Sequence, residues 1–300
     1  MTETVRVAVP RKGRPLEAVL ERVAGRAGVE SVADGIVSTL RYEKAVTKGS
    51  ATADADVYER LAAYSDLSDP HAPEYTLLRD DRDGYPRRVV FDSLTVPVPG
   101  EPFDLQLIGR EEPFRALRTH SFGLGFDSAD LVLEEVVSLR AEGLDAIAAV
   151  NERIDPRETD VRVASGLGDT VHHTLLATPE TLPPGATLDR AFVADHEGPL
   201  CISPRYERLV EAVLGSAALD GVEFVYPDPG VEEEAAIAET GLGVYLTVTG
   251  STAREHGLVI GEHLFPSETV LMENVAETDG PAERARALLV DPDRETAIRV

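Results

Sequence analysis

The chain is short of lysine, because only Lys12, Lys44 and Lys48 occur among its 29 basic residues. It also contains no tryptophan, two methionines and a single cysteine. One cysteine excludes a disulfide within the chain and a cage of thiolates around a metal ion. We expect Cys201 to be a small buried apolar side chain, because no activating base is visible near it in the sequence.

Acidic residues dominate instead, with 54 against 29 basic ones and a formal net charge of −25. A surface rich in acid and poor in lysine keeps a protein hydrated in concentrated salt, where screening weakens its self-repulsion. The composition therefore predicts a salt-adapted protein. The alternative is an acidic surface that docks a basic partner, but the acids are spread along the chain. The same charge argues against nucleic acid as a ligand.

Long apolar runs are also missing, and none approaches the length of 18 residues that a membrane span requires. The first residues contain no apolar core of the length found in signal peptides. We therefore expect a cytoplasmic protein that neither spans a membrane nor is exported.

Strand-like and helix-like patterns alternate along the chain, starting with Val5–Val9, a turn of sequence PRKGRP and apolar residues at helical spacing. Helical patterns include Leu131–Glu142, Tyr206–Leu214 and Val231–Glu239. This alternation predicts an α/β fold with mostly parallel sheets. Residues 45–85 are polar, and we interpret them as a weakly structured insertion or an extended hairpin.

Four segments, in this order, resemble the ATP phosphoribosyltransferases of histidine biosynthesis. They are the opening strand, KGR turn and helix; the run DLQLIGREEPF through LGFDSAD; the strand TVHHTLLATPE; and VEEEAAIAETGLGVYLTVTGSTAREHGL. Each motif is weak alone, but the ordered set is specific. The resemblance leaves out residues 45–85 and implies a short form without the histidine-binding regulatory domain.

This resemblance implies a two-lobed, periplasmic-binding-protein-like (type II) architecture. Residues 1–126 with 256–300 would form lobe I, and residues 127–255 would form lobe II with the phosphate-binding loop. The implied activity is that of a glycosyltransferase, which transfers phosphoribosyl from phosphoribosyl pyrophosphate to ATP. Mg²⁺ would accompany the substrate pyrophosphate, and a homo-oligomer is expected.

The loop VTGST contains the candidate phosphate-binding residues Thr249, Gly250, Ser251 and Thr252. A small, hydroxylated turn before a helix points backbone N–H groups at an anion, and the helix dipole favours the negative charge. The alternative is that Ser251 or Thr252 merely caps the following helix.

The KGR turn supplies Lys12, Gly13 and Arg14, and Arg110 follows the strand DLQLI. By resemblance, Lys12 and Arg14 would be catalytic residues that meet pyrophosphate or nucleotide phosphates. The alternative for these two is a solvated turn. For Arg110 the alternative is a surface arginine paired with a neighbouring glutamate.

The expected acids of the catalytic site are incomplete. Glu232 matches the glutamate of the family's valine-glutamate helix start, although it also belongs to a run of solvated acids. Gly241 and Tyr245 stand where the family has acids that contact the ribose and favour the developing cation. On an extended strand, Glu239 would face the same side as Gly241 and could substitute.

Two further pairs of polar residues are expected to have structural rather than catalytic roles. Asp127 and Asp130 are expected to cap the helix from Leu131. His172 and His173 are neighbours on a strand, so they point to opposite faces and cannot jointly bind one metal ion.

Two hypotheses remain open. The first is a short-form ATP phosphoribosyltransferase. The second is a catalytically diverged paralogue that binds a phosphorylated sugar or nucleotide, or acts as a regulatory partner, and the residues at positions 241 and 245 motivate it.

Overall fold

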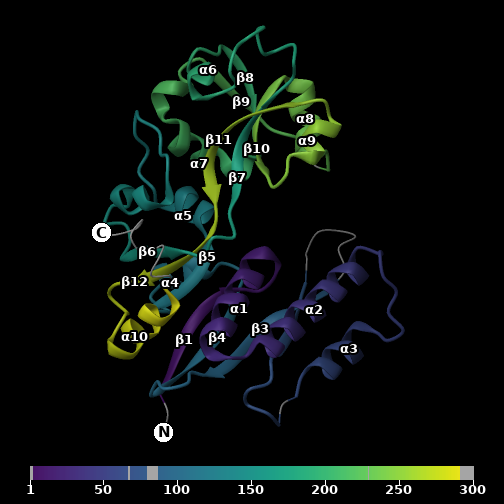
Figure 1. The fold of residues 1–300 in the computed structure, drawn as a ribbon, viewed down its shortest axis with the longest axis vertical. Helices are drawn as coiled ribbons and strands as arrows, with labels where there is room; N and C mark the ends of the chain where they lie inside the picture. Colours follow the sequence, from purple (N-terminus) through teal and green to yellow (C-terminus); the bar gives the residue numbers. More distant parts are fainter. Residues whose placement is uncertain (1–2, 67, 80–86, 229, 291–300) are drawn as a thin grey trace. The chain divides into compact units, whose positions relative to one another are not determined.

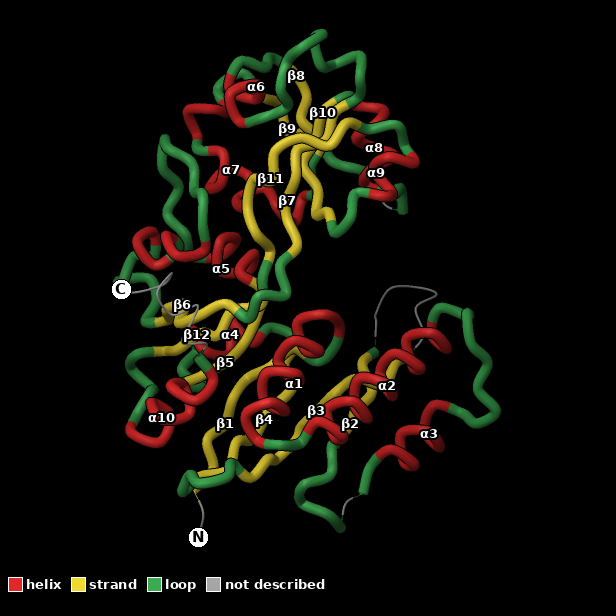
Figure 2. The backbone as a smooth tube through the Cα atoms, in the orientation of Figure 1, coloured by secondary structure: helices red, strands yellow, loops and turns green. Residues whose placement is uncertain are grey.

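The computed structural model describes residues 3–66, 68–79, 87–228 and 230–290 (Figures 1 and 2). The chain forms two compact units. Of the described residues, unit 1 contains those within 3–127, 160–169 and 269–290, and unit 2 contains those within 128–159 and 170–268. Each unit has its own sheet with helices around it, so the expected α/β fold is confirmed.

Unit 1 is built on a seven-stranded sheet of order β2-β3-β4-β1-β5-β12-β6. The strands are β1 (Glu3–Pro10), β2 (Glu74–Leu78), β3 (Arg88–Pro97), β4 (Phe103–Arg110), β5 (Leu124–Ser128), β6 (Val161–Gly166) and β12 (Thr269–Asn274). β1 runs parallel to β4 and β5, whereas β3 is antiparallel to both β2 and β4, and β12 is antiparallel to β6.

Helices of unit 1 cover this sheet. They are α1 (Gly13–Ala27), α2 (Glu30–Thr47), α3 (Val57–Tyr64), α4 (Pro113–Arg118) and α10 (Gly280–Leu289). α1, α2 and α10 share one apolar core with the sheet, in which Leu16, Leu20 and Ile36 are almost fully buried. Apolar residues of α1 recur every three or four positions, which places them on one face of the helix.

Residues 45–85 contain more regular structure than their composition predicts, as far as they are described. The segment contains α3 and β2, and β2 adds an antiparallel strand to β3. Glu43 of α2 is 1% exposed and pairs with Arg60 of α3 at 2.7 Å. The hydroxyl of Tyr64 donates to the same carboxylate at 2.8 Å. These buried polar contacts fix α3 against α2.

Unit 2 has a five-stranded sheet of order β11-β7-β10-β8-β9. Its strands are β7 (Val171–Ala177), β8 (Gly198–Cys201), β9 (Val222–Val225), β10 (Leu242–Thr247) and β11 (Val259–Ser267); its α-helices are α5 (Ala129–Glu135), α6 (Arg190–Ala194), α7 (Glu207–Leu214), α8 (Glu233–Thr240) and α9 (Ser251–Glu255). β8 is parallel to β9 and β10, but β7 is antiparallel to β10 and β11. Both sheets are therefore mixed, which corrects the expectation of mostly parallel sheets.

The boundaries of the units differ from the expected lobes in two places. Residues 160–169 belong to unit 1, because β6 pairs with β12 there. Residues 256–268 belong to unit 2, because β11 pairs with β7. Long-range strand pairing decides both assignments, and no local sequence pattern reveals it.

The helix expected at Leu131–Glu142 is wrong in length, since α5 ends at Glu135. Val137 instead forms an antiparallel bridge with Ile154, and the backbone N–H of Ser138 donates to the Arg153 carbonyl. Tertiary pairing of this β-branched stretch therefore overrides the helical pattern. Within the described residues, no helix has the length and apolar character needed to cross a bilayer.

Candidate functional site

The KGR turn connects the end of β1 to the start of α1 in unit 1. Gly13 has φ +79°, a backbone conformation that glycine adopts without penalty. Lys12 is the residue before the helix, and its side chain makes no capping hydrogen bond. Its ammonium lies 3.5 Å from the Glu111 carboxylate. Parallel pairing of β1 and β4 sets Pro10 beside Arg110, so Arg110 lies close to the same turn.

Arg14 has a structural partner in unit 1. Its guanidinium donates to the Asp169 carboxylate at 2.7 Å and to the Asp169 backbone carbonyl. The same carboxylate accepts from the backbone N–H and hydroxyl of Thr269, at 2.8 and 2.7 Å. Arg14 therefore joins the first turn of α1 to the segments beyond β6 and at the start of β12. A phosphate would have to compete with this network for Arg14.

The expected surface pairing of Arg110 with a neighbouring glutamate is wrong. Its guanidinium lies over the Phe122 ring, 5.1 Å from the centroid, and donates to the Gly109 carbonyl. Glu111 pairs with Lys12, and Glu112 with Arg115 at 2.7 Å. Cation–π contact orients Arg110 without neutralising its charge.

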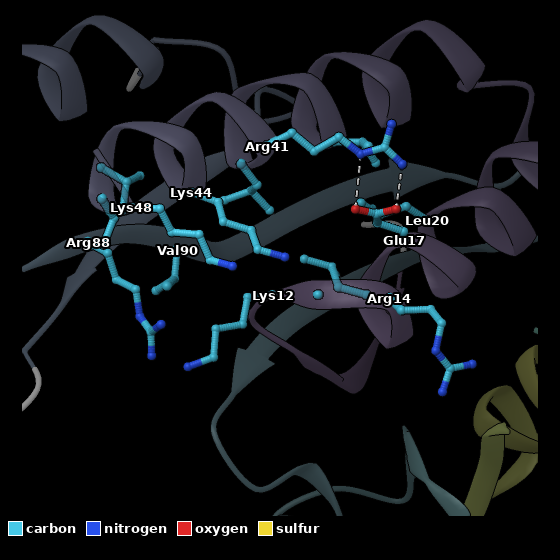
Figure 3. Close-up of a pocket in the computed structure, with 15 residues that line it drawn as sticks. Lys12, Arg14, Glu17, Leu20, Arg41, Lys44, Lys48, Arg88 and Val90 are labelled. Atoms are coloured by element: carbon cyan, nitrogen blue, oxygen red, sulfur yellow. Dashed lines mark hydrogen bonds and ion pairs between the residues drawn. The ribbon is translucent and has the colours of Figure 1, made fainter. Parts of the chain in front are cut away.

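A cavity of about 430 Å³ opens between α1, α2 and β3, next to the KGR turn (Figure 3). All three lysines of the chain line it. Arg14, Arg41 and Arg88 also line it, and Glu17 is the only acid in its lining among the residues that the structure describes. Its apolar lining comes from side chains of α1, α2 and β3, namely Leu16, Leu20, Val37, Leu40, Val89 and Val90. In a chain of net charge −25, this cavity is a local concentration of positive charge.

Figure 3 shows how the basic side chains lie. Lys12, Lys44, Lys48 and Arg88 extend into the same region of the cavity. Arg41 turns instead to Glu17, which it contacts at 2.7 and 3.2 Å, and Arg14 points away from the group. Sequence reasoning identified Lys12 and missed Lys44, Lys48 and Arg88. The scarcity of lysine, applied to all three lysines, would have found two of them.

In unit 2 the candidate phosphate loop lies between β10 and α9. Gly250 precedes the helix with φ +68°, and Val248 is 79% exposed. Because α9 begins at Ser251, neither Ser251 nor Thr252 occupies the capping position, and no side chain caps the helix. The Thr249 hydroxyl lies 3.1 Å from that of Ser251 and accepts from the Ser251 backbone N–H at 3.4 Å. The capping alternative is therefore wrong, and exposed hydroxyls remain at this turn.

Replacing Gly250 by alanine is expected to disturb this loop. A β-carbon there would meet the Ile260 side chain and would require a left-handed backbone, which costs about 1–2 kcal/mol. Gly257, at the other end of α9, is a matched control because it has φ +72° and open space around it. In urea unfolding, Gly250→Ala should lose about 1 kcal/mol more unfolding free energy than Gly257→Ala, because only the former overpacks its surroundings. Equal losses would show that Ile260 accommodates the added atom.

Glu232 and Glu233 lie at the start of α8. Glu232 is 73% exposed and 3.4 Å from the His256 imidazole, which agrees with its interpretation as a solvated acid. Glu233 interacts with Tyr245 on β10. Burial raises the pKa of Tyr245, and the negative charges of Glu233 and Glu234 raise it further. Tyr245 therefore stays a neutral phenol and supplies no negative charge.

The expectation that Glu239 takes the place of a missing acid assumed that Glu239 and Gly241 lie on one strand. The structure contradicts this assumption. Glu239 lies in the last turn of α8, not on an extended strand, and it is exposed. Gly241 follows as the helix C-cap, with φ +102°. A helix end separates the two residues, so the alternation of a strand does not apply to them.

Asp127 lies just before α5 and Asp130 lies in its first turn, but neither caps the helix, which corrects that expectation. Asp127 accepts from the backbone N–H of Phe114 at 3.0 Å, at the start of α4. Asp130 accepts from the Ser267 hydroxyl at 2.9 Å and lies 3.3 Å from the buried His173 imidazole. Both acids are buried, so each forms its hydrogen bonds inside its own unit rather than with solvent.

Other residues singled out from the sequence have structural roles. The His172 ring contacts the His263 ring in a tilted arrangement with centroids 4.5 Å apart, and burial lowers the pKa of His172. Cys201 is buried as expected, and burial raises the pKa of its thiol. In the described part of the chain, no three His, Cys, Asp or Glu side chains come together as metal ligands would.

Taken together, the fold and the sites define an α/β protein with a hydroxyl-rich turn in one unit and a basic cavity in the other. The sequence matches the family model of halobacterial ATP phosphoribosyltransferase over residues 1–300. The chain therefore belongs to this family. No curated protein sequence matches the chain.

Two solved structures are similar to the chain at low identity. The ATP phosphoribosyl transferase (HisG:HisZ) complex from Thermotoga maritima shares 14% identity with a TM-score of 0.43, over 95% of this chain and 94% of that one. YhfZ from Shigella flexneri shares 12% identity with a TM-score of 0.43, over 98% and 86% of the two chains. Both scores are low, so the family assignment rests on the family match.

Proposed function

We propose that this chain is an ATP phosphoribosyltransferase that transfers phosphoribosyl from phosphoribosyl pyrophosphate to ATP, the first step of histidine biosynthesis. The observation that carries the proposal is the family match, which extends over residues 1–300. The presence of two anion-compatible features, the VTGST turn and the cavity beside the KGR turn, is in keeping with substrates that carry many phosphate groups.

In this proposal the VTGST turn binds the 5′-phosphate. Backbone N–H groups at residues 249–252 and the hydroxyls of Thr249, Ser251 and Thr252 are its donors. The KGR turn with Arg110 binds pyrophosphate or nucleotide phosphates. Charge-assisted hydrogen bonds from such cations favour the leaving group, on which negative charge develops. Mg²⁺ belongs to the proposal as a companion of the substrate, because it is held largely by phosphate oxygens and water.

The proposal includes the setting of the enzyme. We propose a cytoplasmic, salt-adapted homo-oligomer, on the grounds of the acidic composition and the family. Size measurement by light scattering in molar KCl tests the oligomer. Activity should rise from about 0.1 to about 2 M KCl if the protein is adapted to salt. Activity that falls over this range would contradict the adaptation.

The test of function is titration of phosphoribosyl pyrophosphate with Mg²⁺ in molar KCl, followed by addition of ATP and measurement of product absorbance. Binding with turnover establishes the transferase. The expected result is turnover that requires Mg²⁺ and both substrates. No binding of phosphoribosyl pyrophosphate would contradict the proposal.

A second candidate is the diverged paralogue that binds a phosphorylated sugar or nucleotide without transfer. The observation that favours it is the absence of a carboxylate at two positions: Gly241 forms a helix cap and Tyr245 is a half-buried neutral phenol. Binding without turnover would identify this candidate. A second chain in the same genome with acids at both positions would favour it too.

A further inference from the structure

The basic cavity of unit 1 gathers charges that repel one another. Lys44 and Lys48 are four residues apart at the end of α2, on the face that lines the cavity. A like-charged pair at this spacing destabilises a helix. The negative end of the helix dipole offsets part of this cost for these two lysines. It does not explain why Lys12 and Arg88 are directed to the same place from other elements.

Lys12 pairs with the Glu111 carboxylate at 3.5 Å, but the other three cations of this group differ from it. Among the described residues, the ammonium groups of Lys44 and Lys48 and the guanidinium of Arg88 have no carboxylate within ion-pair distance. Glu17, the one acid in the described part of the lining, forms an ion pair with Arg41. Acids outnumber bases almost two to one in this chain, so a pocket with unneutralised cations is a departure from its surface composition. Binding of an anionic ligand is the simplest way to offset the repulsion among these cations.

From this arrangement we infer that the cavity binds an oligophosphate anion, with Lys44, Lys48 and Arg88 holding it together with Lys12. A single phosphate engages one or two cations, whereas a chain of two or three phosphates matches cations spread over a turn, a helix and a strand. The volume of about 430 Å³ leaves room for such a chain, and the apolar part of the lining suits an attached organic group.

This inference deepens the proposed function and rests on it for the identity of the substrates, and it adds Lys44, Lys48 and Arg88, which belong to none of the family-like motifs. It names a ligand chemistry that two sources share, namely the triphosphate of a nucleotide and the pyrophosphate of an activated sugar. The experiments below therefore use inorganic tripolyphosphate as the probe, and then compare ATP with phosphoribosyl pyrophosphate.

Amine chemistry tests the inference in the unaltered protein. The chain has three lysines and all of them line this cavity, so acylation of ε-amino groups reports on this cavity alone. We expect saturating tripolyphosphate to slow acylation of Lys44 and Lys48 at least about tenfold, as read by peptide mass spectrometry. Orthophosphate at the same concentration should protect much less. Unchanged acylation under tripolyphosphate would overturn the inference.

Titration of variants supplies an independent measurement. One charge-assisted contact corresponds to roughly a tenfold change in the dissociation constant or more. Lys44→Gln should therefore raise the dissociation constant of tripolyphosphate about tenfold. The double variant Lys44→Gln with Lys48→Gln should raise it roughly a hundredfold. Lys44→Arg should restore most of the affinity. Arg157→Gln is the control, because Arg157 is exposed in unit 2 and far from the cavity in the sequence. Equal affinities in all variants would overturn the inference.

The outcomes separate this inference from the proposed function. Protection and tight tripolyphosphate binding without turnover would uphold the cavity and reject the transferase. Turnover with unchanged KM values in the double variant would uphold the transferase and reject the cavity. If the inference holds, the substrate whose KM rises in the double variant, ATP or phosphoribosyl pyrophosphate, identifies the source of the phosphates.

Discussion

Replacing Glu43 by alanine is expected to destabilise unit 1 by about 3–5 kcal/mol, the usual cost of removing one partner of a buried ion pair. Glu43 is almost fully buried and accepts from Arg60 at 2.7 and 2.9 Å and from Tyr64 at 2.8 Å. Alanine would leave the largely buried Arg60 guanidinium without its carboxylate. Because Glu43 lies on α2 next to Lys44, we also expect weaker anion binding in the adjacent cavity. Urea unfolding in molar KCl measures the stability loss.

The same helix offers a matched control. Glu17 and Arg41 join α1 to α2 through an ion pair whose side chains are 36% and 68% exposed. Glu17→Ala should cost less than about 1 kcal/mol, because solvent and salt screen an exposed pair. A Glu43→Ala loss as small as the Glu17→Ala loss would mean that the buried pair does not fix α3 to α2.

Acidification should reduce the difference in unfolding free energy between the wild-type protein and the Glu43→Gln variant. Burial opposes ionisation of Glu43, but hydrogen bonds from Arg60 and Tyr64 outweigh it and lower the pKa of Glu43. The resulting stabilisation is present above the unfolded-state pKa of about 4.3 and is lost as the pH falls through the lower folded-state value. Unfolding free energies measured across this pH range should therefore converge.

The second large effect concerns Gly241, where the family pattern has an acid. We expect Gly241→Asp to destabilise unit 2 by about 2–4 kcal/mol and to bring no gain in turnover. Its φ of +102° suits glycine, and an added β-carbon would lie 2.5 Å from the Thr181 hydroxyl oxygen, which is hydrogen-bonded to Thr178. The position is therefore a helix C-cap that requires glycine.

Gly185→Asp is the matched control for this substitution. Gly185 has φ +82° and nothing within 4 Å of an added β-carbon, so it carries the backbone penalty alone. We expect its loss of unfolding free energy to be smaller by about 1–3 kcal/mol. A Gly241→Asp protein that is as stable as the wild type, or one that gains turnover, would show that the cap tolerates the acid.

Local chemistry explains what the sequence predicted correctly. The strand, turn and helix at the amino terminus follow from β-branched residues, a glycine at positive φ and apolar spacing of 3.6, all of which act within a few residues. Likewise, the hydroxyl-rich turn after β10 follows from Thr249, Gly250 and Ser251 themselves. The family motifs lie in these local elements, which is why the resemblance was recognisable.

Contacts between distant residues decided the rest. Antiparallel pairing of β7 with β11 and β10 made the sheet of unit 2 mixed, and the partner of Asp127 proved to be α4 rather than α5. Lys12, Lys44, Lys48 and Arg88 share a cavity only because α2 and β3 pack beside the KGR turn. The sequence by itself determined that lysine is scarce and that a strand–turn–helix carries Lys12. Only tertiary packing, which depends on the whole core, decided that all three lysines line one cavity.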